Sequence, residues 1–317
     1  MNEQNIKKNS PKAWLLAARP QTLTGAAVPV LIGITLAYVD ISNEFGAEHF
    51  NWLPAVLCLL FAFVMQIDAN FINDFFDYVN GNDDTSRRLG PLRACTQGWV
   101  SIDAMKRAIA ATTVLACVVG LPLILYGGLE MILVGALCVV FCFLYTTHLS
   151  YMGLGDVLVV VFFGIVPVCI TYYVLYCSVS DVIVPESYEP HYMTWQTFMA
   201  SLACGLVVDG LLLVNNYRDR DNDREDGKLT LVVRLGARNS RRLFLLVGVV
   251  ATLMGLVFWM NGHVLAFVFP FVYLVLHFYT YLKLVKIDRG RELNVCLAET
   301  ARNILVYGLC VVAGLLV

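Results

Sequence analysis

The chain has 317 residues, of which 59% are hydrophobic and 15% are charged, and its mean hydropathy is +0.70. A soluble domain typically carries about 25% charged residues, so this composition excludes an ordinary soluble protein and indicates a chain that resides in a lipid bilayer. The formal net charge is −2, and we expect no nucleic-acid partner.

Membrane-spanning segments follow one another along the whole chain. A spanning helix needs about 20 mainly apolar residues, and nine charge-poor stretches meet that length. These stretches are residues 14–39, 52–73, 104–126, 128–147, 155–177, 195–217, 243–261, 264–285 and 298–317. No loop is long enough for an appended soluble domain. The sequence therefore predicts an all-α membrane protein in which residues 1–317 form one domain of nine transmembrane helices.

The basic residues predict how these helices are oriented. All 22 Lys and Arg residues lie in four segments: 7–19, 87–107, 218–242 and 283–302. These segments alternate with loops that hold acids but no Lys or Arg, such as DISNEFGAEHF. Because cytoplasmic loops carry the excess of Lys and Arg, we expect a cytoplasmic N-terminus and an external C-terminus, which requires an odd number of helices. Most of these basic residues then serve as orientation signals and lipid contacts.

An acidic motif occurs twice, each time where a helix reaches the cytoplasmic side. Asn73-x-x-x-Asp77 ends the second span and Asn215-x-x-x-Asp219 ends the sixth, and both residues of the pair recur at an offset of 142. The two helices have the same orientation, so an ancestral parallel duplication of about four helices is plausible.

Helical spacing places the polar residues of each motif on one helix face. At 100° per residue, the first face holds Asn70, Asn73, Asp74 and Asp77, and the second holds Asn215, Asp219 and Asp223 if the sixth helix continues. Carboxylates at this spacing repel one another and require a compensating cation.

The chemistry of these two faces favours a hard metal ion. Oxygen donors from Asp and Asn suit Mg²⁺ or Ca²⁺, and the ten cysteines show no CxxC or Cys/His spacing for a softer metal. The segment DRDNDREDGKLT does not fit a calcium loop, because Arg224 and Thr230 replace its required Gly and Glu. Arg93, Arg218 and Lys228 flank the acids, so the pattern suits a diphosphate bridged by Mg²⁺.

Other acids allow different interpretations. Asp68 and Asp209 lie about two turns deeper in the membrane, where they could mark the ion pathway of a transporter, orient or deprotonate an acceptor substrate, or make a structural hydrogen bond. The remaining acids near the motifs are expected to be solvated: Asp84, Asp221, Glu225 and Asp226.

Three stretches resemble one known family. AARPQTLTGAAVPVLIG is similar to the family's entry to its first helix, and QIDANFINDFFDYVNGNDD followed by GPLRACTQG resembles its first aspartate motif. NNYRDRDNDREDGKLTLVVRLG resembles its second motif and is the most specific of the three. By these motifs the chain resembles the UbiA superfamily of intramembrane prenyltransferases, and within it the bacterial branch that prenylates 1,4-dihydroxy-2-naphthoate.

The resemblance implies a fold, a reaction and a set of residues. The fold is a bundle of nine helices around a central cavity, in a bacterial cytoplasmic membrane, with the site open toward the cytoplasm. The reaction transfers a polyprenyl group from polyprenyl diphosphate to 1,4-dihydroxy-2-naphthoate, with loss of carbon dioxide and diphosphate, giving demethylmenaquinol for menaquinone biosynthesis. Another aromatic acceptor, such as 4-hydroxybenzoate or a tocopherol-type or haem precursor, stays open. The implied Mg²⁺ ligands are Asn73, Asp77, Asp83, Asp219 and Asp223, and the implied substrate-binding residues are Asn70, Arg93, Tyr145, Asn215, Arg218 and Lys228.

Two departures from the family pattern stand out. The general pattern has a third acid four residues after Asp77, which here is Gly81, whereas Asp83 lies two residues further on as in the naphthoate branch. The loop after the fourth helix, YTTHLSYMGLGD, has only His148 where the family often has a basic residue, although Tyr145 and Asp156 fit the pattern.

Overall fold

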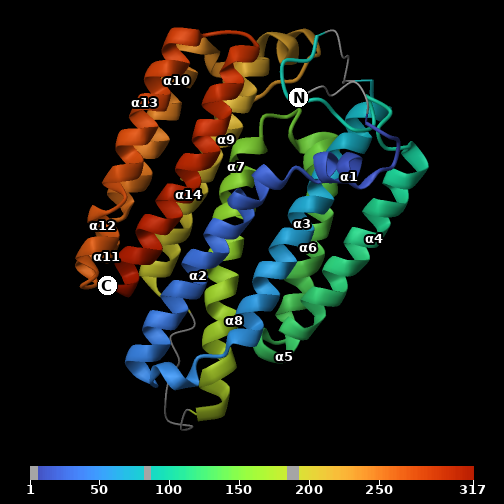
Figure 1. The fold of residues 1–317 in the computed structure, drawn as a ribbon. Helices are drawn as coiled ribbons and strands as arrows, with labels where there is room; N and C mark the ends of the chain where they lie inside the picture. Colours follow the sequence, from blue (N-terminus) through green and yellow to red (C-terminus); the bar gives the residue numbers. More distant parts are fainter. Residues whose placement is uncertain (1–5, 82–86, 184–192) are drawn as a thin grey trace.

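The computed structural model describes residues 6–81, 87–183 and 193–317, and throughout these ranges the regular elements are helices. Figure 1 shows them as one bundle. The α-helices are α1 (Pro11–Ala18), α2 (Leu23–Glu44), α3 (Trp52–Val79), α4 (Ile102–Gly120), α5 (Ile124–Gly127), α6 (Glu130–Leu144), α7 (Gly155–Val160), α8 (Val166–Ile183), α9 (Trp195–Glu225), α10 (Leu231–Met254), α11 (Leu256–Met260), α12 (Val264–Val268), α13 (Phe271–Ile287) and α14 (Asn294–Leu316).

These helices confirm the predicted number of spans. Within the described ranges, nine helical segments are long and apolar enough to cross a membrane, because α1 with α2, α4 with α5, α7 with α8, α10 with α11 and α12 with α13 each form one continuous segment. Helix α1 lies at one end of the bundle and α14 ends at the other, as an odd number of spans requires (Figure 1).

Both motif-bearing helices extend beyond their apolar stretches. The second span continues to Val79 and the sixth to Glu225, so Asp77, Asp219 and Asp223 are all helical. The polar ends of α3 and α9 lie at the same end of the bundle as the N-terminus (Figure 1).

The seventh span begins earlier than hydropathy predicts. Its helix starts at Leu231 rather than near residue 243, with Thr230 capping the first turn through a bond from the Val233 amide to its hydroxyl. The additional turns carry four arginines, which lower the hydropathy of this stretch. One face of the helix nevertheless packs on the bundle.

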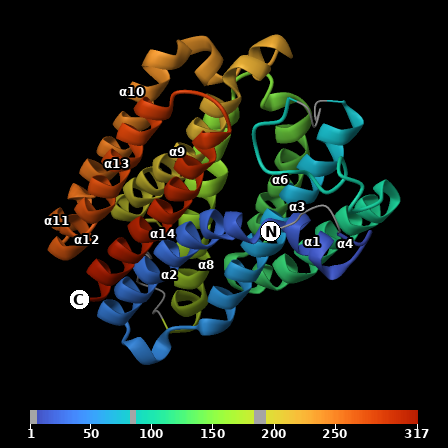
Figure 2. The same cartoon turned by 45° about the horizontal axis from the view of Figure 1, so that its top comes forward.

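The helices fall into an inner and an outer set. α10 and α13 lie on the far side of α9 and α14 from α3, α4 and α6 (Figure 2). The inner helices approach closely where glycine permits it. A Cβ atom on Gly164 would lie 2.5 Å from the Cα atom of Gly205, so the chain just after α7 contacts the backbone of α9 directly.

Candidate active site

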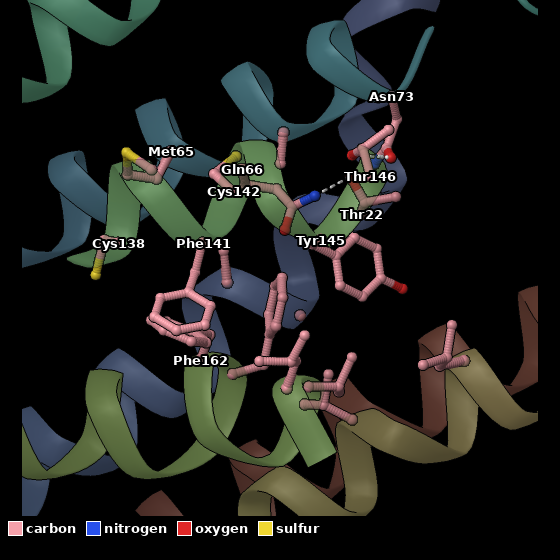
Figure 3. A pocket seen from close by; sticks show the side chains of 18 of the residues that line it. Thr22, Met65, Gln66, Asn73, Cys138, Phe141, Cys142, Tyr145, Thr146 and Phe162 are labelled. Atoms are coloured by element: carbon pink, nitrogen blue, oxygen red, sulfur yellow. Dashed lines mark hydrogen bonds between the residues drawn. The ribbon is translucent and has the colours of Figure 1, made fainter. Parts of the chain in front are cut away.

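One large cavity of about 1370 Å³ lies between the inner helices. The end of the cavity at the two motifs is polar and is lined by residues of both, while apolar side chains from α2, α3, α4, α6 and α8 line most of the remainder. Figure 3 shows part of this wall, with Phe141 and Phe162 against one another and Tyr145 nearer the polar end. The cavity can therefore hold a long apolar chain attached to an anionic head.

The first motif presents two polar side chains to the cavity. Asp77 forms an ion pair with Arg93, and both residues line the cavity. Asn73 also lines it and accepts a 2.6 Å hydrogen bond from the Thr146 hydroxyl, which fixes its amide toward α6 (Figure 3).

Two other residues of the first motif have different roles. The carboxylate of Asp74 accepts hydrogen bonds from the backbone amides of Ala94 and Cys95, at 2.9 and 3.1 Å. It thus anchors the loop that carries Arg93. The amide of Asn70 donates to the Ala18 carbonyl at 2.9 Å and does not line the described cavity, so this predicted substrate-binding residue joins α3 to the end of α1.

The second motif is organised around a buried arginine. The Arg218 side chain is 3% exposed and donates hydrogen bonds to Asn215, Asp219 and Asn294. Asn215 and Asp219 line the cavity together with Arg218. The guanidinium therefore sets the position of both polar side chains of this motif.

The last acid of the second motif has an unused oxygen. Asp223 pairs with Lys228 at 3.7 Å through Oδ1, while its buried Oδ2 has no hydrogen-bond partner among the described residues. The Nε and Nη1 atoms of Arg93 are likewise buried and unpartnered there. The Asp223 oxygen is an acceptor suited to a hard cation, and the two Arg93 nitrogens are donors suited to an anion.

The donor set fits Mg²⁺ only if other ligands complete the shell. Across the described parts of the chain, no group of three or more His, Cys, Asp or Glu side chains converges closely enough to hold a metal ion by itself. Mg²⁺ is usually held by one or two carboxylates with water and substrate phosphate, which the asparagine and aspartate oxygens at this cavity end permit.

The loop that follows the first motif closes over the second. Asn222 on α9 donates to the Arg87 carbonyl at 3.0 Å, and Asn294 on α14 donates to the Leu89 carbonyl at 2.8 Å. Gly90 lies against Arg218, since a Cβ at this position would be 2.7 Å from Nη2. The polar cavity end is thus covered by residues 87–91.

Some cavity residues were not predicted. Arg19 lines the polar end, and its buried Nη2 atom has no partner in the described part of the chain. The stretch AARPQTLTGAAVPVLIG, which resembles the family's entry to its first helix, contains Arg19, but no role was predicted for this residue. Tyr151 also lines the cavity. Burial raises the pKa of its phenol, as do the charges of Asp77 and Asp223, so it remains a neutral hydrogen-bonding group. Asn294 carried no signal in the sequence.

The predicted Asp83 and the control residue Asp84 lie outside the described residues. The other predicted site residues line the same cavity, with the exception of Asn70: Asn73, Asp77, Arg93, Tyr145, Asn215, Arg218, Asp219, Asp223 and Lys228.

The chain is similar to known proteins both in sequence and in fold. The model of the UbiA prenyltransferase family matches residues 26–301. The 1,4-dihydroxy-2-naphthoate octaprenyltransferase of Escherichia coli is 36% identical over 251 residues, covering 76% of this chain and 74% of the relative. The Haemophilus influenzae protein of the same name is 32% identical and covers 76% and 75%. A UbiA homolog from Archaeoglobus fulgidus, solved with DMAPP and Mg²⁺, has a TM-score of 0.59 at 14% identity and covers 95% of this chain and 99% of that one.

Proposed function

The chain belongs to the UbiA prenyltransferase family, and from this premise we propose that it transfers a polyprenyl group from polyprenyl diphosphate to 1,4-dihydroxy-2-naphthoate. Carbon dioxide and diphosphate would leave, and demethylmenaquinol would form for menaquinone biosynthesis. The names of the Escherichia coli and Haemophilus influenzae relatives support this acceptor. The observation that carries the proposal is the single cavity with both motifs at one end and an apolar wall beyond them.

The division of the cavity suits the two parts of the donor substrate. An isoprenoid tail is apolar and gains free energy in a lipid-like channel, whereas its diphosphate requires cations and hydrogen-bond donors. We place the polar end at the cytoplasmic surface because the basic loops border it. Residues 1–317 would act as one membrane domain.

The residues that would hold Mg²⁺ are oxygen donors from both motifs. We assign this role to Asn73, Asp77, Asp219 and Asp223, with Asp83 added on its sequence position. When bound, Mg²⁺ would neutralise negative charge on the departing diphosphate. The solved Archaeoglobus fulgidus homolog with Mg²⁺ and DMAPP supports this choice of ion.

The basic residues would share the stabilisation of the leaving group. Arg93 and Lys228 each pair with a motif acid, and each lines the cavity. Charge that develops on the diphosphate as the allylic carbon–oxygen bond breaks would draw these cations toward it, and this favours the transition state over the bound substrate. Arg218, held by three partners, would keep Asn215 and Asp219 in place and contribute its charge.

The apolar wall of the cavity would limit the access of water to the allylic cation. The electron-rich ring carbon of the acceptor captures the cation, and the carboxylate on that carbon leaves as carbon dioxide. Tyr145 lies between the polar end and the apolar wall, where donor and acceptor would meet (Figure 3).

A competition assay tests the proposed acceptor. Purified protein in lipid would receive Mg²⁺, labelled polyprenyl diphosphate and equal amounts of 1,4-dihydroxy-2-naphthoate and 4-hydroxybenzoate. We expect a prenylated naphthoquinol and an equivalent amount of carbon dioxide. Prenylation of 4-hydroxybenzoate alone would overturn the acceptor assignment, and ion flux in proteoliposomes without prenyl transfer would favour the transporter interpretation.

A further inference from the structure

Two buried carboxyl groups lie beside the cavity and take no part in the functions assigned above. Asp156 begins α7 and is 7% exposed, and Asp209 lies in the middle of α9 and is 4% exposed. The Oδ1 atom of each is buried without a hydrogen-bond partner in the described part of the chain. The two groups lie on helices that contact one another, since a Cβ on Gly155 would lie 3.4 Å from the Leu212 side chain, three residues beyond Asp209.

A third buried acid shows what a purely structural carboxylate looks like in this protein. Asp68 on α3 accepts hydrogen bonds from the hydroxyls of Thr112 and Thr113 on α4, at 2.5 and 2.8 Å. Each of its oxygens is therefore satisfied by the adjacent helix. Asp156 and Asp209 differ because each retains an unused oxygen, and a buried polar atom left in this state is unfavourable.

The fold brings the pair together by backbone contact. A Cβ on Gly205 would lie 2.8 Å from the Val160 carbonyl oxygen, so α7 and α9 approach as closely as glycine allows. Two carboxylates in a medium of low polarity cannot both be charged without a large electrostatic cost, so the stable arrangement holds one proton between them.

Tyr145 connects this pair to the main cavity. A Cβ on Gly155 would lie 3.8 Å from the Tyr145 hydroxyl, so the phenol rests on the residue that precedes Asp156. Tyr145 lines the main cavity and also a second, small cavity of about 10 Å³, which Asp156, Asn216 and Lys228 line with it. A polar space of this size accommodates about one water molecule.

We propose that Asp156 and Asp209 form a proton-holding pair that acts through Tyr145 on the hydroxyl group of the aromatic acceptor. The inference rests on the proposed function. The pair takes the acceptor's hydroxyl proton while the ring attacks, and it returns this proton before the product leaves. Asp156 and Asp209 are positioning residues, and Tyr145 is the group that reaches the substrate cavity.

The step balances in atoms and electrons. Loss of the hydroxyl proton next to the carboxylated carbon converts C–OH to C–O⁻. As the ring attacks, C–O⁻ becomes C=O, a ring π electron pair forms the new carbon–carbon bond, and the diphosphate departs with the electrons of the broken carbon–oxygen bond. The resulting β-keto carboxylate loses carbon dioxide, whose bonding electrons regenerate the aromatic oxyanion. The returned proton then restores the hydroxyl, so no net proton is consumed.

Other charged groups near the pair belong to neighbouring elements. Lys228 lines the small cavity, and the side chain of Arg234 lies beside Gly153. Asp77 and Asp223 line the main cavity together with Tyr145. The pH dependence of kcat must therefore be compared between variants that leave these four residues unchanged.

The test uses the full chain in lipid with Asp156→Asn, Asp209→Asn, the double variant, Tyr145→Phe and the matched control Asp68→Asn. We expect each variant of the pair, and Tyr145→Phe, to lose about 100-fold in kcat for naphthoate prenylation, while Asp68→Asn stays within about twofold of the unaltered protein. The double variant should lose no more than the single ones, because the residues act as one unit.

Two readouts separate this role from structural damage. Thermal stabilisation by polyprenyl diphosphate with Mg²⁺ should be unchanged in Asp156→Asn, Asp209→Asn and the double variant. The kcat of the unaltered protein should rise with pH as the doubly protonated pair loses one of its two protons. This rise should be absent from the Asn variants.

Full kcat in either Asp→Asn variant, or an unchanged pH profile, would overturn the proposal. Loss of the stabilisation by diphosphate would also overturn it, since the pair would then serve the donor site. An unaltered protein that does not prenylate naphthoate would instead refute the proposed function, and the inference with it.

Discussion

Arg218 and Asn294 lie 76 residues apart in the chain, yet Nη1 of Arg218 donates a 2.8 Å hydrogen bond to Oδ1 of Asn294. The same asparagine donates from Nδ2 to the Leu89 carbonyl at 2.8 Å. One side chain of α14 therefore joins the second aspartate motif to the loop that follows the first, and the polar end of the cavity depends on it.

Asn294→Leu should disturb the donor site through this junction. Leucine has a similar volume but no polar atoms, so a buried guanidinium hydrogen and the Leu89 carbonyl lose their partner, at a cost of about 1–3 kcal/mol. We expect a lower thermal unfolding midpoint and a KM for polyprenyl diphosphate raised more than kcat is lowered. Unfolding in detergent and steady-state kinetics measure both.

Asn239→Leu is the matched control for this substitution. Its amide donates to the Leu235 carbonyl in its own helix, on an exposed face of α10. An equal effect of the two substitutions on KM would contradict the role assigned to Asn294.

Asp77→Ala and Asp219→Ala should each abolish turnover while the protein still inserts and folds. Removal of either carboxylate takes a ligand from the proposed Mg²⁺ and frees a paired arginine, and losses of at least about 100-fold in kcat are expected. Radiolabelled product formation at saturating Mg²⁺ measures this.

Two other acids serve as comparisons. Asp221→Ala removes an exposed acid of α9, which faces Arg289 at 3.9 Å, and should be mild. Asp84→Ala should also be mild on its sequence position. Near-normal activity of Asp77→Ala or Asp219→Ala would refute the metal assignment.

The number of membrane spans could be predicted from the sequence because its physical cause is local. Each span needs its own apolar length, so hydropathy predicted the nine spans that the described helices confirm. The arginine-rich first turns of α10 escaped this count because only one face of that helix is buried.

The sequence did not predict which side chains of the first motif face the cavity. Helical spacing places Asn70 and Asp74 near Asn73, but the face is wide, and only tertiary contacts decide which side chain turns to the cavity. Asn70 meets the Ala18 carbonyl and Asp74 meets the amides of residues 94 and 95. The pairing of Asp156 with Asp209 likewise depends on the contact between α7 and α9.

Gly164→Val should destabilise the bundle where α9 meets the chain after α7. A Cβ at Gly164 would lie 2.5 Å from the Gly205 Cα atom and 2.6 Å from the Ser201 carbonyl oxygen, and backbone cannot move aside as a side chain does. We expect a loss of at least about 2 kcal/mol in the free energy of unfolding or failure to accumulate in the membrane.

Gly135→Ala is the control for that prediction. Within the described structure, a Cβ at Gly135 on α6 meets no atom within 4 Å. Its thermal unfolding midpoint should match that of the unaltered protein. A Gly164→Val protein that is equally stable would show that α9 can move away from the chain after α7.

Asp288→Asn should remove a source of stability that depends on pH. The Asp288 carboxylate accepts a 2.5 Å hydrogen bond from Tyr217 and one of 2.8 Å from Arg241, and it lies at the end of α13 with φ of 60°. The hydrogen bond from Tyr217, and then the charges of Arg220 and Arg241, lower the pKa of this carboxyl below its ordinary value of 3.8. Asparagine has nearly the same shape as aspartate, so the substitution removes mainly the charge.

The sign of the effect follows from the lowered pKa. The unfolded chain binds the proton more tightly, so the stabilisation by Asp288 is fully present above pH 3.8 and is lost as pH falls through the lower folded pKa. The unaltered protein should therefore unfold at a higher temperature than Asp288→Asn at pH 7, and the two midpoints should converge in acid. Because the Asp288 side chain is 40% exposed, the difference at pH 7 should shrink with added salt. A constant difference in midpoint between pH 7 and pH 3 would show that this carboxylate does not stabilise the contact between α9 and α13 through its charge.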